Sequence, residues 1–341
     1  MQNLLDPAIL FFVFGVVAGT LKSNLEIPPS ISRFLSLYLL MALGLKGGFA
    51  LAKSGLTGEV VTTLGLAVSL AIIIPALTYQ MLKRFLSGYD AAAIAATYGS
   101  VSAVTFITAM QYLENQGIAY GGHMAAAMAL MESPAIVMAV LFANSLRQTS
   151  TAPLATQPVL AAGGTVLLAG PTGLKTSGAS LSKILHESFT DGAQLLLFGA
   201  MVIGYMTGEA GEATMAPFSI DLFKGMLAFF LLDMGLMAAR NMGELKDKSP
   251  WLLVYALVAP LMHAGLALAM AAAIGIGSGN AALLMTLAAS ASYIAVPAVL
   301  RYAIPEAKPS LYFGMSLGLT FPFNIIVGIP LYAALADRVL G

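Results

Sequence analysis

Long apolar runs with few charges dominate the pattern of hydrophobic and polar positions along the chain. Several of these runs reach the ~20 residues that an α-helix needs to cross a bilayer. The segment 148–182 is rich in Gly, Pro, Ser and Thr without a sustained period, which is typical of a flexible linker. The remaining pattern predicts ten helices, at roughly 7–22, 30–52, 57–85, 89–114, 119–146, 183–207, 216–240, 250–274, 278–302 and 308–338.

Composition places the chain in the membrane. Hydrophobic residues make up 59% of the 341 and charged residues 9%, with a mean hydropathy of +0.87. Soluble domains carry about 25% charged residues, so the sequence predicts an all-α polytopic membrane protein. Sixteen basic and sixteen acidic residues leave no net charge, which gives no electrostatic basis for binding nucleic acid. The absence of cysteine excludes disulfides and thiolate metal sites. The first residues lack a basic region and a small-residue cleavage site, so we expect a retained first helix.

The two halves of the chain resemble each other. "YLLMALGLKGGFAL" (38–51) aligns with "FFLLDMGLMAARNM" (229–242), and "DAAAIAATYGSVSAV" (90–104) aligns with "NAALLMTLAASASYI" (280–294), at a nearly constant offset. Five helices is an odd number, so the second half must start on the opposite side of the membrane. The sequence therefore predicts a 5+5 inverted-topology repeat, an architecture frequent among secondary transporters. The predicted parts are a first repeat at 1–147, the linker at 148–182 and a second repeat at 183–341.

Basic residues indicate the orientation. If the N-terminus lies outside, most Lys and Arg side chains face the cytoplasm, as the positive-inside rule requires. Both termini are then outside and the linker 148–182 is cytoplasmic. We expect a multi-pass protein of the inner (plasma) membrane.

Hydroxyl residues gather at equivalent places in the aligned apolar segments. If these helices are interrupted there, the freed N–H groups at a half-helix N-terminus attract a small anion without any arginine. Close helix packing is the alternative, because small and hydroxyl residues also mark helix contacts in membranes. The symmetric occurrence favours the anion site. The candidate residues are Gly99, Ser100, Ser102, Thr105, Ser290 and Ser292.

Oxygen-bearing side chains near two prolines suggest a cation site. Glu132 and Ser133 precede Pro134, while Thr320 and Asn324 flank a second proline in the last helix. Carboxylate, hydroxyl, amide and freed backbone oxygens are hard ligands suited to Na⁺. The alternative is a proline kink with a locally satisfied carboxylate.

Four other ionisable residues lie inside apolar runs, where each is costly. Lys46 and Asp233 stand on repeat-related helices, and we expect them to form an intramembrane ion pair. His123 and His263 lack a second ligand at helical spacing and are expected to be packed. Because the sequence contains no H-E-x-x-H, G-x-S-x-G or G-x-x-x-x-G-K-[ST] motif, we expect no enzyme and no cofactor.

Over nearly its whole length outside the linker, the chain resembles the SbtA-type sodium-dependent bicarbonate transporter family. The resemblance rests on the helix count and on "IPPSISRFLSLYLLMALGLKGGFAL" (27–51), "YGSVSAVTFITAMQYLE" (98–114), "MESPAIVMAVLFAN" (131–144), "LHESF" (185–189), "GELKDKSPWLLVYALVAPLMHAG" (243–265) and "LAASASYIAVPAVLRYAIPEAKPSLYFGMSLGLTFPFNI" (287–325).

The resemblance implies a core domain and a gate domain, each drawing helices from both repeats, assembled as a homotrimer. It also implies a PII-like regulatory partner on the cytoplasmic side and Na⁺ as coupling ion. Substrate is implied near the breaks of the fourth and ninth helices, whose matching positions are Ser100, Val101, Ser102, Ser290, Ala291 and Ser292.

Four positions depart from that family. It carries an acidic residue where this chain has Tyr293, aspartate where it has Glu132, threonine where it has Lys46, and an apolar residue where it has Asp233. The sequence predicts Na⁺-dependent uptake of bicarbonate or a similarly small anion by alternating access. A carrier of small organic anions is the first alternative, because Tyr293 would shape a larger or more apolar pocket. An intramembrane enzyme and a passive channel are the others.

Overall fold

The computed structural model describes residues 6–55, 57–150, 192–242 and 249–341. These residues form helices joined by short loops, and no strand occurs in the described ranges. The helices are α1 (Pro7–Thr20), α2 (Pro29–Ser54), α3 (Gly58–Leu82), α4 (Gly88–Gly99), α5 (Ala103–Gln116), α6 (Met124–Ser150), α8 (Gly192–Ala216), η2 (Pro217–Asp221), α9 (Phe223–Met242), α10 (Pro250–Ile274), α11 (Ser278–Ala289), α12 (Ala295–Ala303), α13 (Pro309–Phe313), η4 (Gly314–Thr320), α14 (Phe321–Phe323), η5 (Asn324–Gly328) and α15 (Ile329–Leu340). The linker expected at 148–182 lies outside the described residues, apart from the last turn of α6.

In the described part of the chain, seven helices are long and apolar enough to cross a membrane. The sequence predicted ten. Helices Pro7–Thr20 and Ser278–Ala289 are apolar but short, and Gly192–Met242 is one apolar run of 51 residues. That run contains a residue with non-helical geometry, Gly208, at φ 53 and ψ −138. At 1.5 Å per residue a straight helix of this length would be about 77 Å long, well beyond the ~30 Å of a bilayer core.

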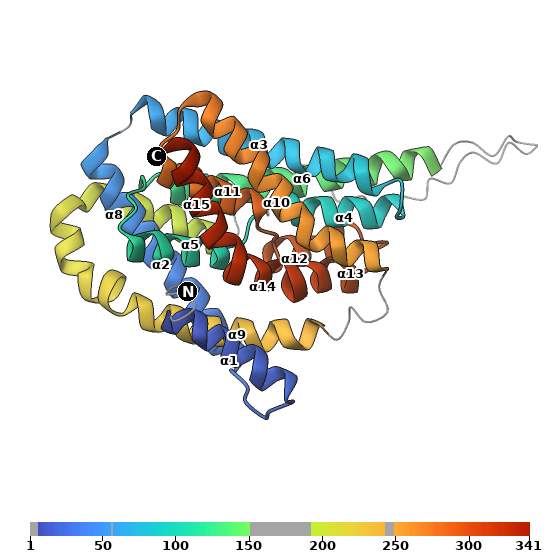
Figure 1. Ribbon diagram of the computed structural model, residues 1–341, viewed down its shortest axis with the longest axis horizontal. Coiled ribbons are helices and arrows are strands. Elements are labelled where there is room, and N and C mark those ends of the chain that lie inside the picture. Colours follow the sequence, from blue (N-terminus) through green and yellow to red (C-terminus); the bar gives the residue numbers. More distant parts are fainter. Residues whose placement is uncertain (1–5, 56, 151–191, 243–248) are drawn as a thin grey trace, which may run out of the picture.

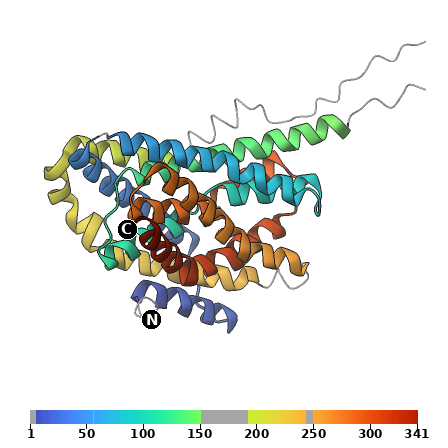
Figure 2. The same cartoon turned by 45° about the horizontal axis from the view of Figure 1, so that its top comes forward.

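Two helix pairs form one group, which we call the paired group: α1 packs along α9, and α2 packs along α8. In Figures 1 and 2, α1 lies beside α9 at the edge of the molecule, and α8 leads into α9. Glycines bring the backbones together. A Cβ at Gly235 would lie 3.0 Å from the Cα of Gly15, and one at Gly48 would lie 2.9 Å from the Cα of Gly204. Small residues allow this close approach, which favours helix association in membranes.

The remaining helices form a second group, which we call the crossed group. Helix α3 packs on α4 and α6, and α11 packs on α10 and α15. Figure 1 shows α3, α4 and α6 along one edge, with α10, α11 and α15 between them and the paired group. Both groups contribute to one large apolar cluster that includes Leu39, Phe106 and Leu284, each fully buried.

Prolines affect two helices differently from each other. Helix α6 continues through Pro134 to Ser150, so this proline does not end the helix. The last predicted helix does change character around its proline: π-helical turns at Gly314–Thr320 and Asn324–Gly328 flank the short α14. Such π segments occur often at functional sites in helices.

Candidate functional site

Both hydroxyl-rich helices are interrupted where the sequence analysis placed their clusters. Helix α4 ends at Gly99, Ser100 is extended at φ −97 and ψ 179, and α5 starts after Ser102. Helix α11 ends at Ala289, Ser290 is extended at φ −78 and ψ 162, and α12 starts at Ala295. Part of the backbone N–H and carbonyl groups at these ends therefore lacks a partner within its own helix.

The two breaks contact each other. The N–H of Ser102 donates to the hydroxyl of Ser290 at 3.0 Å, and the N–H of Ser292 donates to the carbonyl of Thr97 at 2.8 Å. Ser290 also donates from its hydroxyl to the carbonyl of Leu287 at 2.8 Å. The first two bonds join segments more than half the chain apart in sequence, and they hold both extended backbones in a fixed relation.

Two of the predicted hydroxyls also bond the first turns of the helices that follow. Ser102 is the N-cap of α5, and its hydroxyl accepts from the N–H of Thr105 at 3.2 Å and from its hydroxyl at 2.9 Å. Ser, Thr, Asn and Asp are preferred at an N-cap because they satisfy an N–H that the helix leaves unpaired. The hydroxyl of Ser292, two residues before the N-cap Ile294 of α12, accepts from the N–H of Val296 at 3.3 Å.

A cavity of about 250 Å³ lies at the crossing. It is bounded by both breaks and by α2, α6 and α8. Its lining contains six polar side chains, which are Ser36, Ser102, Glu132, Gln194, Ser292 and Tyr293. Its apolar lining residues are Leu40, Val101, Ala103, Val104, Met128, Ile136, Ala193, Leu197, Ile294, Ala295 and Val299. We call it the crossing cavity.

Of the predicted anion-site residues, Val101, Ser102, Ser292 and Tyr293 line the crossing cavity. The others are buried and lie outside the lining. Gly99 lies against Pro75 of α3, where an added Cβ would be 2.6 Å from the proline ring. The hydroxyl of Ser100 donates to the carbonyl of Glu132 at 3.3 Å. The further predicted residues outside the lining are Thr105, Ser290 and Ala291.

The N-terminal turn of α5 faces the cavity through Ala103 and Val104, and that of α12 through Ala295. A helix N-terminus carries a partial positive charge and N–H donors, which suit an anion. None of the described residues that line the cavity is basic. The arrangement thus has the donors of an anion site, with Glu132 as the single acidic side chain in the lining.

Tyr293 has an unusual environment in this cavity. Its side chain is 4% exposed, and its ring lies 5.2 Å from that of Phe321 in an edge contact. Its hydroxyl is buried and interacts with the side chain of Ser102, but without the geometry of a well-formed hydrogen bond. A buried hydroxyl that is poorly satisfied is costly, so a ligand or water bound in the cavity would relieve that cost.

The predicted cation ligands are separated in the structure. The carboxylate of Glu132 lines the crossing cavity and accepts from the amide of Gln194 at 2.7 Å. Thr320 instead donates to the carbonyl of Ala256 at 2.7 Å and shares a bond with the hydroxyl of Tyr98. The side chain of Ser133 lies outside the described residues.

Asn324 does not line the cavity but hydrogen-bonds the end of one broken helix. Its amide donates at 2.8 Å to the carbonyl of Ala289, the last residue of α11, and it accepts from Tyr332 at 2.8 Å. Among the described residues, no group of three or more His, Asp or Glu side chains forms a metal site.

The sequence analysis missed two polar residues of the cavity lining, Gln194 and Ser36. The only signal for Gln194 was a single amide in an otherwise apolar run.

The expected ion pair between Lys46 and Asp233 is wrong. The ammonium of Lys46 contacts the carboxylate of Glu114 at 2.6 Å. Asp233 instead interacts with Ser32. Ser32 precedes Lys46 on α2 by about four turns, or roughly 21 Å. Equivalent positions in two aligned halves are related in sequence, which does not bring their side chains together in space.

The Lys46–Glu114 pair belongs to a polar cluster at the C-terminal end of α5. The hydroxyl of Tyr120 donates to the same oxygen of Glu114 at 2.7 Å. Burial and the nearby carboxylate raise the pKa of Tyr120, which keeps this donor protonated. The next residue, Asn115, bonds Asp6 before α1 and Lys224 of α9. This end of α5 is therefore tied to three helices of the paired group.

Removal of one partner of this pair is expected to destabilise the protein more than removal of both. Lys46→Met leaves the carboxylate of Glu114 without its cation, and we expect a loss of about 1–3 kcal/mol because both side chains are only partly exposed. Thermal unfolding of Lys46→Met and of the Lys46→Met, Glu114→Gln double variant measures the difference. Lys53→Met, which breaks the more exposed pair with Glu212, is the matched control and should cost less. Equal effects of the single and double variants would contradict coupling between Lys46 and Glu114.

The histidines are packed, as predicted. His123 is 4% exposed and His263 is 9% exposed. Burial lowers the pKa of His123, so its imidazole is neutral near pH 7.

The protein is a multi-pass membrane protein, because it has several apolar helices long enough to span a bilayer. Two helices are interrupted and meet at a cavity with polar lining residues. The family model of the Na⁺-dependent bicarbonate transporter superfamily matches residues 7–337. The chain belongs to that superfamily, which confirms the resemblance seen in the sequence. None of the curated proteins matches the chain.

Proposed function

We propose that the protein is a secondary active transporter for Na⁺-dependent uptake of bicarbonate or a similarly small anion. The observation that supports this most is the contact between two broken helices beside the crossing cavity. There Ser102 and Ser292 present hydroxyls next to the N-terminal turns of α5 and α12. Such half-helix ends bind anionic groups in transporters of inverted-repeat architecture.

The contact pattern supports ten helices in a 5+5 inverted repeat. Helix α1 packs on α9, and their counterparts α8 and α2 pack on each other. The α3–α4 contact likewise has its counterpart in α10–α11. The proposal splits Gly192–Met242 into two spans and counts the short α1 and the α11–α12 pair as one span each, with repeats at 1–147 and 183–341. The paired group then corresponds to the gate domain and the crossed group to the core domain.

A second cavity supports alternating access. It has a volume of about 230 Å³ and is lined on α2, α5 and α6 by Lys46, Gly47, Glu114, Met124 and Ala125, among others. The same three helices line the crossing cavity. On α6 the two linings are less than one turn apart, because Met128 borders the crossing cavity and Ala125 borders the second one.

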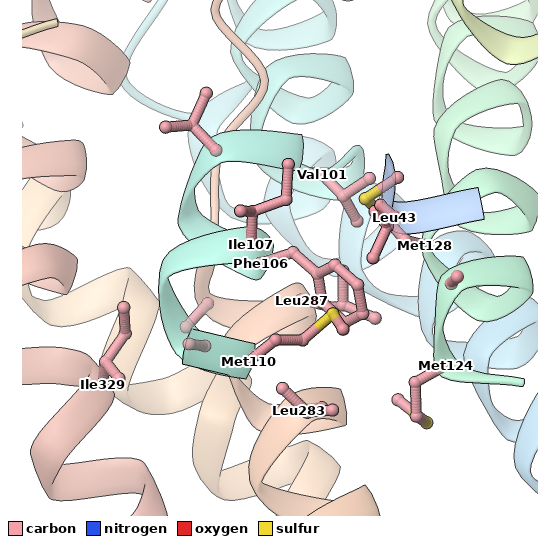
Figure 3. Close-up of a cluster of buried hydrophobic side chains, with 14 of the residues drawn as sticks. Leu43, Val101, Phe106, Ile107, Met110, Met124, Met128, Leu283, Leu287 and Ile329 are labelled. Carbon is pink, nitrogen blue, oxygen red and sulfur yellow. The ribbon is translucent and has the colours of Figure 1, made fainter. Parts of the chain in front are cut away.

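One apolar cluster borders both cavities, with Met128 in the lining of the crossing cavity and Met110 and Met124 in the lining of the second one. Figure 3 shows Leu43 of α2, Met128 of α6 and Phe106 of α5 packed in one cluster, with Met110 and Met124 beside it. Leu43, Phe106 and Met124 are fully buried. An anion cannot cross such a cluster without a large desolvation cost, so movement between the groups would have to open the path.

Na⁺ would offset the negative charge of the anion and of Glu132. Carrying both ions together lowers the electrostatic cost of a path with a low dielectric constant. Glu132 and the oxygen of the Gln194 amide are the best-placed cation ligands in the crossing cavity. Thr320 and Asn324 would act by holding the breaks.

A carrier of small organic anions is the second candidate. Most residues that line the crossing cavity are apolar, and the ring of Tyr293 adds to them. The carboxylate group of such a substrate would then occupy the helix ends, while the apolar part of the substrate contacts residues such as Leu40 and Val299.

The predicted homotrimer, the PII-like partner and the outside location of both termini stay predictions. Cross-linking in native membranes would test the first two.

Uptake into proteoliposomes tests the proposed function. Labelled bicarbonate and a panel of small carboxylates are offered with and without an inward Na⁺ gradient. Saturable bicarbonate uptake that requires the gradient is expected. Selective uptake of a carboxylate would favour the second candidate, and ion currents far above carrier rates would indicate a channel.

Single-cysteine labelling tests the two cavities without any substrate. The chain has no cysteine, so Ser36→Cys reports on the crossing cavity and Ala50→Cys on the second one. An impermeant thiol reagent is expected to reach the two positions from opposite sides of the membrane. Labelling of both from the same side would contradict alternating access between these cavities.

A further inference from the structure

Asp233 is a buried carboxylate that the proposed anion and Na⁺ sites do not use. It lies midway along α9, within the apolar run Gly192–Met242, and its side chain is 5% exposed. Its Oδ2 atom has no hydrogen-bond partner among the described residues. An intramembrane acid of this kind often marks an ion pathway or a proton relay.

The charged and titratable groups around Asp233 are few. Helix α1, which packs along α9, carries none, and neither do η4 and α14. The π-helix η2 carries Asp221, about three turns before Asp233. On α2, Ser32 interacts with Asp233 and the adjacent Arg33 is exposed. The hydroxyl of Tyr38 donates to the carbonyl of Phe218, and Lys46 pairs with Glu114. Arg240 acts on Asp233 from about two turns further along α9. No cation therefore sits directly against this carboxylate in the described structure.

Helix α2 connects Asp233 to the crossing cavity. It packs on α9, and its Ser32 interacts with Asp233. The charge of Asp233 also acts on the buried Tyr293 hydroxyl, which interacts with Ser102. Tyr293 lines the cavity together with Ser102 and Ser36, and Ser36 lies one turn from Ser32 on α2. Asp233 and Tyr293 belong to different helix groups, so relative movement of the groups would change the access of Asp233 to cavity water.

The chemistry of this place suits a proton. An isolated ionised carboxylate in an apolar medium carries a desolvation cost of many kcal/mol, and a bound proton removes it. Na⁺ would need several oxygen ligands, whereas among the described residues the hydroxyls that interact with Asp233 are those of Ser32 and Tyr293. A single carboxylate with one unpartnered oxygen is sufficient for a proton.

We propose that Asp233 is a proton-binding site that loads and releases one proton in each transport cycle. The proton comes from water in the crossing cavity, and it converts the carboxylate to a neutral carboxyl group. The proton returns to water when the paired group moves relative to the crossed group. This inference rests on the proposed function for its place in the cycle, while proton binding itself is independent of the substrate.

Infrared difference spectroscopy of the purified protein between acid and alkaline pH tests the binding directly. A carbonyl band of a buried protonated carboxyl is expected, which disappears as the pH rises. The band should be lost in Asp233→Asn and kept in Glu114→Gln, the matched intramembrane control. The same band in Asp233→Asn, or no titrating band in the natural protein, would overturn the proposal. If Asp233→Asn does not fold, Asp233→Glu decides, because its band and midpoint must shift.

Transport provides the second readout. At constant bicarbonate concentration, net uptake by the natural protein is expected to vary with pH, and Asp233→Asn should lose that dependence while still exchanging labelled anion. A pH profile unchanged by Asp233→Asn would refute the proton cycle. If the natural protein moves no anion at all, the proposed function fails, and the infrared result still decides whether Asp233 binds a proton.

Discussion

Ser102→Leu is expected to abolish anion uptake while the protein still folds. The change removes a hydroxyl that lines the crossing cavity and fills the space beside the N-terminal turn of α5. Loss of one hydrogen bond to a charged ligand costs about 1.5–3 kcal/mol, a factor of roughly ten to a hundred in affinity. The isobutyl group adds steric exclusion, so uptake should fall below detection. Initial rates in proteoliposomes measure this.

Two comparisons separate the site from the fold. Loss of the N-cap bond from Thr105 costs about 1 kcal/mol, which lowers the melting temperature modestly without unfolding the protein. Ser102→Thr keeps the hydroxyl and should keep measurable uptake. Ser69→Leu, on the outer side of α3 where the hydroxyl bonds only the carbonyl of Gly65, should transport normally. Normal uptake by Ser102→Leu would remove Ser102 from the site.

The sequence predicted the interruptions because their signal is local. Hydroxyl and small residues in an apolar helix are visible in one segment, and the aligned segment repeats them. Which hydroxyl faces the cavity is set by contacts between distant segments. Ser290 looked equivalent to Ser102, but its hydroxyl receives the Ser102 N–H and is buried behind the lining.

The partners of charged side chains were less predictable, because they too are determined by contacts between distant segments. The partner of Lys46 is Glu114, which stands at the end of α5 and carried no pairing signal in the sequence. Thr320 and Asn324 have the oxygens of cation ligands, yet the tertiary structure uses them to hold Tyr98 and the end of α11. Helix number stays a prediction beyond the seven long apolar helices of the described residues, because α1 and α11 are short and α8 continues into η2 and α9.

Gly235→Leu is expected to give the largest loss of stability. Helices α1 and α9 touch backbone to backbone at this point. A Cβ at Gly235 would overlap the carbonyl oxygen of Phe12 and lie 2.9 Å from the backbone nitrogen of Val16. Rigid backbone cannot move aside as a side chain can, so α1 would have to separate from α9. Overpacking costs about 1–3 kcal/mol even where side chains can adjust, and more is expected here.

The same helix supplies the control for this prediction. Gly225 also lies on α9, but nothing stands within 4 Å of an added Cβ. Gly225→Leu therefore makes the same change in composition and helix propensity without the clash. The melting temperature in detergent should fall sharply for Gly235→Leu and little for Gly225→Leu. Equal melting temperatures would show that α1 does not pack against α9 at Gly235. A sharp fall for Gly235→Leu alone would support the α1–α9 contact, on which the proposed symmetry with α8 and α2 depends.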